Sequence, residues 1–138
     1  MQPTIEPTAS VQIDEYPRSW CPTKESIICV GFESGRIFHL DSSGELLEES
    51  SIEGSVIGLV ELDGSIIAAS STNGLFSLGE IVWNLDMESG CEHISPSNIG
   101  IFAIDGSDNI MHVSPKGEVL SSKKIGPVGV IQSSDEKE

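Results

Sequence analysis

The sequence predicts an all-β fold built from repeated sets of short strands. Three observations support this prediction. The apolar stretches are short and rich in Val and Ile, clusters of Gly, Ser and Asp separate them, and the same arrangement returns along the 138-residue chain. Short β-branched runs between turn residues are typical of strands joined by hairpins, whereas a helix would need a longer amphipathic stretch.

The first unit shows the pattern most clearly. Apolar runs at 26–30 and 36–40 flank a turn at 33–35, and a second turn at 41–44 leads into a third run from residue 45. Gly, Asp and Ser favour such turns, because Gly tolerates positive φ and the other two hydrogen-bond the nearby backbone. The unit therefore predicts consecutive antiparallel hairpins.

This unit recurs further along the chain. Segment 35–46 aligns without a gap with segment 108–119, 73 residues later (108 − 35), and the Ile, His, Gly and Glu of the two segments are identical. A shortened copy lies between them at 74–81. An apolar strand is expected before each copy, at 27–30, 66–69 and 101–104.

The middle unit sets the register of the repeat. Gly44, Gly79 and Gly117 are nearly evenly spaced (79 − 44 and 117 − 79), so we take these three as equivalent turn glycines. Aligning Trp83 with His39 would instead make Gly90 the middle turn glycine, and the interval from Gly90 to Gly117 is too short for four strands. In the regular register, the strands of the middle unit are expected at 56–62, 66–70, 75–78 and 80–85.

The period given by these glycines, filled with short strands, predicts the blades of a β-propeller. The segment 54–58 is echoed at 126–130, where a further strand is expected. The predicted fold is therefore all-β, with β-propeller-type repeats forming about three four-stranded blades plus one extra strand, an incomplete propeller. We expect residues 1–18 to form a flexible N-terminal arm, 19–132 the blades and 133–138 an acidic flexible tail.

Charge and composition exclude several classes of function. The net charge is −15, from 22 acidic and 7 basic residues, which disfavours binding to nucleic acid or to anionic membranes. No apolar run approaches the roughly 18 residues that a membrane span needs, and the N-terminus lacks the features of a signal peptide. We therefore expect a cytoplasmic protein without membrane insertion.

The cysteines do not suggest a metal site or a disulfide framework. Cys21, Cys29 and Cys91 are few, odd in number and without CxxC spacing. We expect them to be buried thiols in a reducing compartment.

Two stretches resemble WD repeats. Residues 19–25 followed by 27–37 resemble the opening of a repeat, in which an aromatic residue and a Pro-containing turn precede an apolar strand. Residues 81–86 resemble the strand that ends in Trp-Asp, with Asn84 in place of Asp. The similarity covers 19–132 and is greatest to the N-terminal propeller repeats of intraflagellar transport complex A subunits, with the propeller subunit of the anaphase-promoting complex as a second similar case. It implies a noncatalytic protein–protein interaction scaffold in a ciliary or other trafficking assembly.

The WD resemblance has departures, and two alternatives stay open. The sequence has no Trp-Asp or Gly-His dipeptide, so the His-to-Asp hydrogen-bond network of the family does not carry over. Residues 85–90 resemble the turn of quinoprotein-type propellers, which implies a ligand-binding or redox propeller, although the Trp that normally follows is missing. The second alternative is a partial propeller that needs a partner or self-assembly to close.

No pattern in the sequence indicates a catalytic, cofactor-binding or metal site. His39 and His112 are equivalent in the repeat, so we expect structural roles in two separate blades rather than a shared metal. The sequence contains no nucleophile elbow and no phosphate-binding loop. Trp20, Phe38 and Trp83 are the candidates for partner binding or for packing between blades.

Three blades would leave two sheet faces open, whereas closed propellers usually have four to eight blades. A longer chain, another protein or a second copy could cover these faces. Two copies would make a six-bladed ring, so we expect either protein partners or a homo-oligomer that completes the propeller.

Overall fold

The computed structural model describes residues 15–79 and 82–125, which form twelve strands and no helix. The all-β prediction is confirmed. The first sheet contains β1 (Pro17–Pro22), β2 (Ile28–Phe32), β3 (Arg36–Leu40) and β4 (Leu46–Ser51). The second contains β5 (Val56–Leu62), β6 (Ser65–Ser70), β7 (Gly74–Ser77) and β8 (Asn84–Asp86). The third contains β9 (Cys91–Ser97), β10 (Gly100–Asp105), β11 (Asn109–Val113) and β12 (Val119–Lys124).

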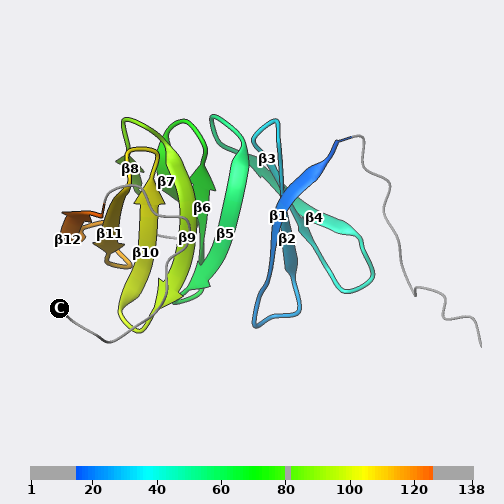
Figure 1. Ribbon diagram of the computed structural model, residues 1–138. Helices are drawn as coiled ribbons and strands as arrows, with labels where there is room; N and C mark the ends of the chain where they lie inside the picture. Colours follow the sequence, from blue (N-terminus) through cyan, green and yellow to red (C-terminus); the bar gives the residue numbers. More distant parts are fainter. Residues whose placement is uncertain (1–14, 80–81, 126–138) are drawn as a thin grey trace, which may run out of the picture.

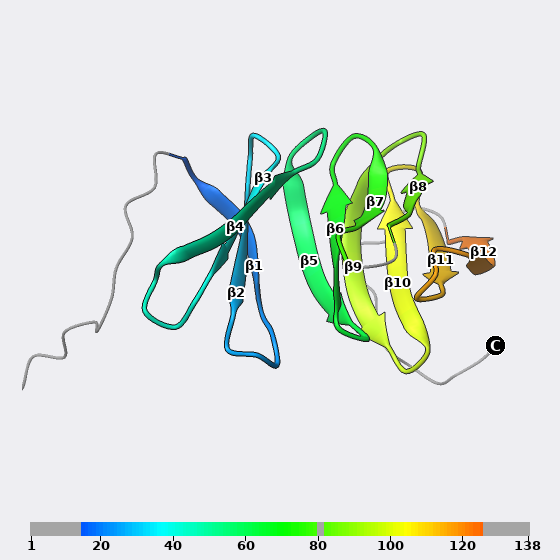
Figure 2. The ribbon, with the colours of Figure 1, turned by 180° about the vertical axis from the view of Figure 1, so that it is seen from behind.

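Each sheet is an antiparallel meander in which neighbours in sequence are neighbours in space. The first strands of adjacent sheets contact each other, β1 against β5 and β5 against β9. Figures 1 and 2 show the three sheets in chain order, with β5 between the first sheet and the rest. The described residues therefore form three blades of an unclosed propeller, as predicted.

Equivalent turns in the first and third blades confirm the long repeat. Between β3 and β4 the N–H of Gly44 donates to the carbonyl of Asp41, and between β11 and β12 the N–H of Gly117 donates to Ser114. The two glycines have φ of 85° and 87°. The side chains of Asp41 and Ser114 also accept N–H groups two and four residues ahead. A turn followed by one left-handed residue is a common hairpin connection, and it favours Gly at this position.

The register of the middle blade differs from the expected one. The fourth strand, β8, begins at Asn84 rather than at residue 80, and residues 80 and 81 lie outside the described part. Gly79 is not in the left-handed region and is not the turn glycine. A Cβ on Gly79 would lie 2.0 Å from the Ser65 hydroxyl oxygen, so glycine is needed there for close packing.

The structure differs from other expectations as well. β1 extends to Pro22, where the sequence predicts a Pro-containing turn, and it begins at Pro17, inside the proposed arm. The sequence does not predict β9, because Cys91 is the only fully buried residue in it. The extra strand at 126–130 and the tail at 133–138 lie outside the described residues.

Two apolar clusters hold the blades together. The joint between the first and second blades contains Cys21, Cys29, Ile37, Val56, Leu59, Ile66 and Ala68. The joint between the second and third blades contains Val60, Ile67, Ala69, Leu75, Met87, Cys91, Ile101, Ala103 and Val113. All three cysteines are buried free thiols, as predicted, and burial raises the pKa of Cys29 to about 11 and that of Cys91 to about 12.

Candidate protein-interaction face

The first blade has one face without a neighbouring blade among the described residues. Strand pairing places Trp20, Val30, Phe38 and Glu49 in one row across its four strands. The adjacent row contains Cys29, which packs against the second blade. Since successive side chains on a strand point to opposite faces, the row of Trp20 points away from the second blade. We call this side the open face of the first blade.

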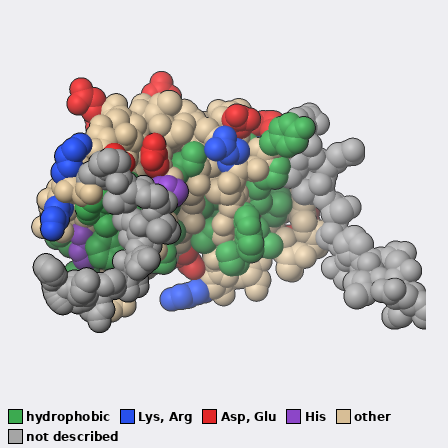
Figure 3. Space-filling model, viewed as in Figure 1, with side chains coloured by type: hydrophobic (Ala, Val, Ile, Leu, Met, Phe, Trp, Pro, Cys, Tyr) green, Lys and Arg blue, Asp and Glu red, His purple; other side chains and the backbone are tan. Residues whose placement is uncertain are grey.

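The open face contains two buried phenylalanines and several exposed apolar side chains. The rings of Phe32 and Phe38 meet edge to face, with centroids 4.9 Å apart, and both side chains are buried. Trp20 is 67% exposed, and Ile28 and Leu46 are exposed at 38% and 45%. Figure 3 shows hydrophobic side chains gathered over the part of the molecule formed by the first blade. Such groups gain free energy when a partner removes them from water.

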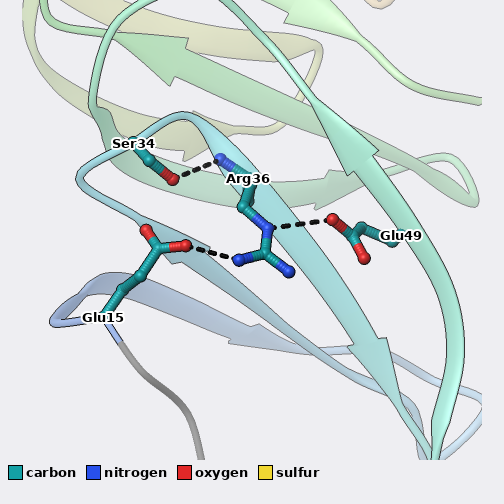
Figure 4. Close-up of polar contacts among 4 residues, drawn as sticks. All are labelled: Glu15, Ser34, Arg36 and Glu49. Carbon is teal, nitrogen blue, oxygen red and sulfur yellow. Dashed lines mark hydrogen bonds and ion pairs between the residues drawn. The ribbon is translucent and has the colours of Figure 1, made fainter.

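A charged cluster borders these apolar side chains (Figure 4). The Arg36 guanidinium donates to Glu15 at 2.7 Å and to Glu49 at 2.9 Å, and it lies 5.0 Å from the centre of the Phe38 ring. The backbone N–H of Arg36 donates to the Ser34 hydroxyl at 3.4 Å. Hydrogen bonds from Ser34 and Arg36 lower the pKa of Glu15, and hydrogen bonds to Glu49 and Glu15 raise that of Arg36. The cluster carries one net negative charge.

The third blade has the other outward face. One row across it contains Ser95, Phe102, His112 and Ser121, and the next contains His93, Ile104, Ile110 and Lys123. Phe102 is 41% exposed and stacks on the His112 ring, with centroids 4.4 Å apart. Nε2 of His112 lies 2.9 Å from the Ser97 hydroxyl. We call this side the outer face of the third blade; it is more polar than the open face and carries a lysine.

The structure separates the three predicted site residues. Trp20 and Phe38 share the open face, the first exposed and the second buried. Trp83 instead lies where the second and third blades meet: its indole N–H donates to the Pro115 carbonyl at 3.0 Å, and a Cβ on Gly117 would come within 2.5 Å of its ring. Whether Trp20 and Phe38 bind a partner stays a prediction.

Sequence reasoning missed Arg36, Glu49 and Phe32. Strand alternation from Trp20 through Val30 to Phe38 could have found Phe32, which lies on the same side of β2 as Val30. The charged cluster had no sequence signal, because Glu15 and Glu49 are far apart in the chain.

The described residues do not bring the repeat-equivalent histidines together and do not form a metal-binding cluster. His39 lies 3.4 Å from the Cys29 sulfur in the first blade, whereas His112 pairs with Ser97 in the third. Within 15–79 and 82–125, no three His, Cys, Asp or Glu side chains are placed to hold a metal ion. A cavity of about 470 Å³ lies between the end of β4 and the outer strands of the second blade, and Glu53 is the only titratable side chain among its described lining residues. An acid–base pair would need two such groups.

No helix long and apolar enough to cross a lipid bilayer occurs in the part of the chain that the structure describes.

Solved structures with similar folds match this chain at low sequence identity. The WD40 β-propeller domain of Doa1 matches with a TM-score of 0.63 and 17% identity, over 78% of this chain and 40% of that one. BBS1N, solved in complex with ARL6DN, matches with a TM-score of 0.66 and 12% identity, over 91% of this chain and 43% of that one. A chain of Kuenenia stuttgartiensis hydrazine synthase matches with a TM-score of 0.70 and 17% identity, over 85% of this chain and 39% of that one.

This chain therefore spans about two fifths of each of these proteins. No protein-family model and no curated protein matches the sequence. The matches support the β-propeller fold, and because this fold serves both enzymes and binding proteins, they do not choose between those functions.

Proposed function

We propose that the chain is a noncatalytic, WD-repeat-like protein-interaction module, and that a protein partner binds the open face of the first blade. The observation that carries this proposal is the exposure of Trp20 in one row with Val30 and Phe38, beside a buried pair of phenylalanines. A large exposed aromatic over an ordered floor is the kind of group that dominates binding energy at protein interfaces.

The composition of the face defines the kind of partner. Arg36 lies against Phe38 and is held by two carboxylates, so its planar group keeps a fixed position. Arginine and aromatic side chains are enriched at interfaces, and Arg36 has exposed surface left for contacts. The net negative charge of the cluster favours a partner surface that is apolar or locally basic, and the net charge of the whole chain disfavours nucleic acid.

The cellular setting is part of the proposal. The solved complex of BBS1N with ARL6DN supports the binding of another protein by a similar fold. The WD-like segments of the sequence, which resemble repeats of trafficking scaffolds, are the ground on which we propose a role in a cytoplasmic trafficking or ciliary assembly. We propose that the interacting domain includes the strands from Pro17 onward together with Glu15, and that the module works without a cofactor.

Site-specific crosslinking tests the proposal. A photoreactive p-benzoylphenylalanine is placed at Trp20 or, as a control, at Ile99, which is 60% exposed in the turn between β9 and β10 of the third blade. We expect a crosslinked protein of defined mass from position 20 and none from position 99. Trp20→Glu should then weaken binding of the identified protein without lowering the urea midpoint of unfolding. The absence of a defined product at position 20, or equal products at both positions, would argue against the proposal.

A further inference from the structure

We infer that the partner on the open face is a second copy of this chain, and that two copies close a six-bladed ring. In this ring the outer face of the third blade of each copy packs on the open face of the first blade of the other. The inference rests on the proposed function, whose binding face it uses. Closed propellers usually have four to eight blades, and among multiples of three only six lies in that range.

The two outward faces correspond to the two surfaces that pack against each other between successive blades. The chain already forms this kind of interface twice. His112, Ile110 and Phe102 lie 73 residues after His39, Ile37 and Cys29 (for example, 112 − 39). Ile37 and Cys29 are fully buried against the second blade. Their equivalents have no following blade in the described chain, and Phe102 is 41% exposed. A first blade from another copy would cover Phe102 as the second blade covers Cys29.

The open face likewise corresponds to a face that is covered elsewhere in the chain. Phe38 is the repeat equivalent of Met111 (111 − 38), which packs into the joint between the second and third blades. The same side of the first blade carries exposed Trp20 and Ile28. The open face of the first blade is therefore suited to pack against the outer face of a preceding blade. The third blade has an outer face of this kind that no described residue covers.

The charges of the two faces are complementary. On the open face the row of Phe38 ends in Glu49 on β4, and the cluster around Arg36 carries one net negative charge. On the outer face the row of Ile110 ends in Lys123 on β12. β4 and β12 are both the outermost strands of their sheets. Opposite charges would thus meet at the rim, while Trp20 and Phe102 meet further in.

Two-fold symmetry makes both joints form together. Each copy offers one open face and one outer face, so a pair uses all four surfaces and leaves none for growth into a filament. A head-to-tail contact that closes in this way gives a dimer of defined size.

The experiment measures solution mass by light scattering coupled to size exclusion, with the full chain at micromolar concentration. We expect a mass of twice the 14.7 kDa of one chain. Phe102→Glu and Trp20→Glu should each weaken the dimer by about tenfold or more, because each places a charge in both joints. Ile99→Glu, a change at a similarly exposed site of the third blade, should leave the mass unchanged. Circular dichroism checks that each variant remains folded.

Mixing the two interface variants tests the head-to-tail geometry. In a dimer of either variant alone, both interfaces contain a glutamate. In a dimer of one Trp20→Glu copy and one Phe102→Glu copy, one interface contains both glutamates and the other contains none. Mixing should therefore restore dimer that neither variant forms at the same concentration. A monomer for the unsubstituted chain, larger aggregates, or a dimer that only Trp20→Glu disrupts would overturn the inference.

The crosslinking experiment separates this inference from the proposed function. A product at position 20 with twice the mass of the chain supports both. A product with a different protein supports the proposed function and overturns the second copy as partner.

Discussion

The contact between Trp83 and Gly117 allows a quantitative test of how the second and third blades are joined. Gly117 has φ of 87°, and alanine in this region costs about 1–2 kcal/mol, partly offset by about 0.4–1 kcal/mol from the less flexible unfolded chain. The added Cβ would also lie 2.5 Å from Cδ2 of Trp83, so the ring must move. Moving it breaks the 3.0 Å hydrogen bond to Pro115, worth about 1 kcal/mol. We expect Gly117→Ala to lower the free energy of unfolding by about 2 kcal/mol.

The matched control is Gly64→Ala. Gly64 has φ of 81°, and a Cβ there would meet no atom within 4 Å, so only the backbone strain of about 1 kcal/mol remains. Urea unfolding followed by Trp fluorescence measures both variants, in a Trp20→Phe background that leaves Trp83 as the single reporter. In a parallel series read by circular dichroism, Trp83→Ala should reduce the cost of Gly117→Ala to that of the control. Equal costs for the two glycine variants would refute the packing of Trp83 on Gly117.

Three further predictions address the core, the acid response and the thiols. Ile67→Ala, at a fully buried position, should lower the free energy of unfolding by about 2–5 kcal/mol in urea, whereas Ile99→Ala, at a 60% exposed one, should change it by less than about 0.5 kcal/mol. Burial tends to raise the pKa of Asp105, but hydrogen bonds from Asn109 and Ser107 and the charge of Lys124 together lower it overall. Its ionised form therefore stabilises the fold above the unfolded pKa of about 3.9, and this contribution is lost as pH falls through the lower folded value. Urea titrations at pH 6 and pH 3 should show a smaller acid loss for Asp105→Asn than for the unsubstituted chain; equal losses would contradict this. The Cys91 thiol, with a pKa of about 12, should react with a thiol reagent at pH 8 only after urea unfolding, and rapid labelling of the native chain would show that Cys91 is not buried.

The sequence was sufficient to predict the repeat, because buried strands leave an apolar signal. β6 is a nearly continuous apolar run, since its two sides face the first and third blades and both are buried. β9 leaves little signal for the opposite reason: of its seven residues, Cys91 alone is fully buried. The expected position of β8 is wrong because Gly79 imitates a turn glycine in the alignment, whereas it allows close packing against Ser65.

Which neighbour packs on a site residue could not be predicted, because it depends on the position of the blade in the array rather than on residue type. Phe38 and Met111 occupy equivalent places in the repeat, yet Met111 packs into a joint while Phe38 lies on a face without a neighbouring blade in the described chain. An interblade core and an interaction surface are thus made of the same kinds of residue. What distinguishes them is whether another blade follows, so a substitution at the exposed Trp20 of the open face should affect association, whereas one at Met111 in the internal joint should affect folding.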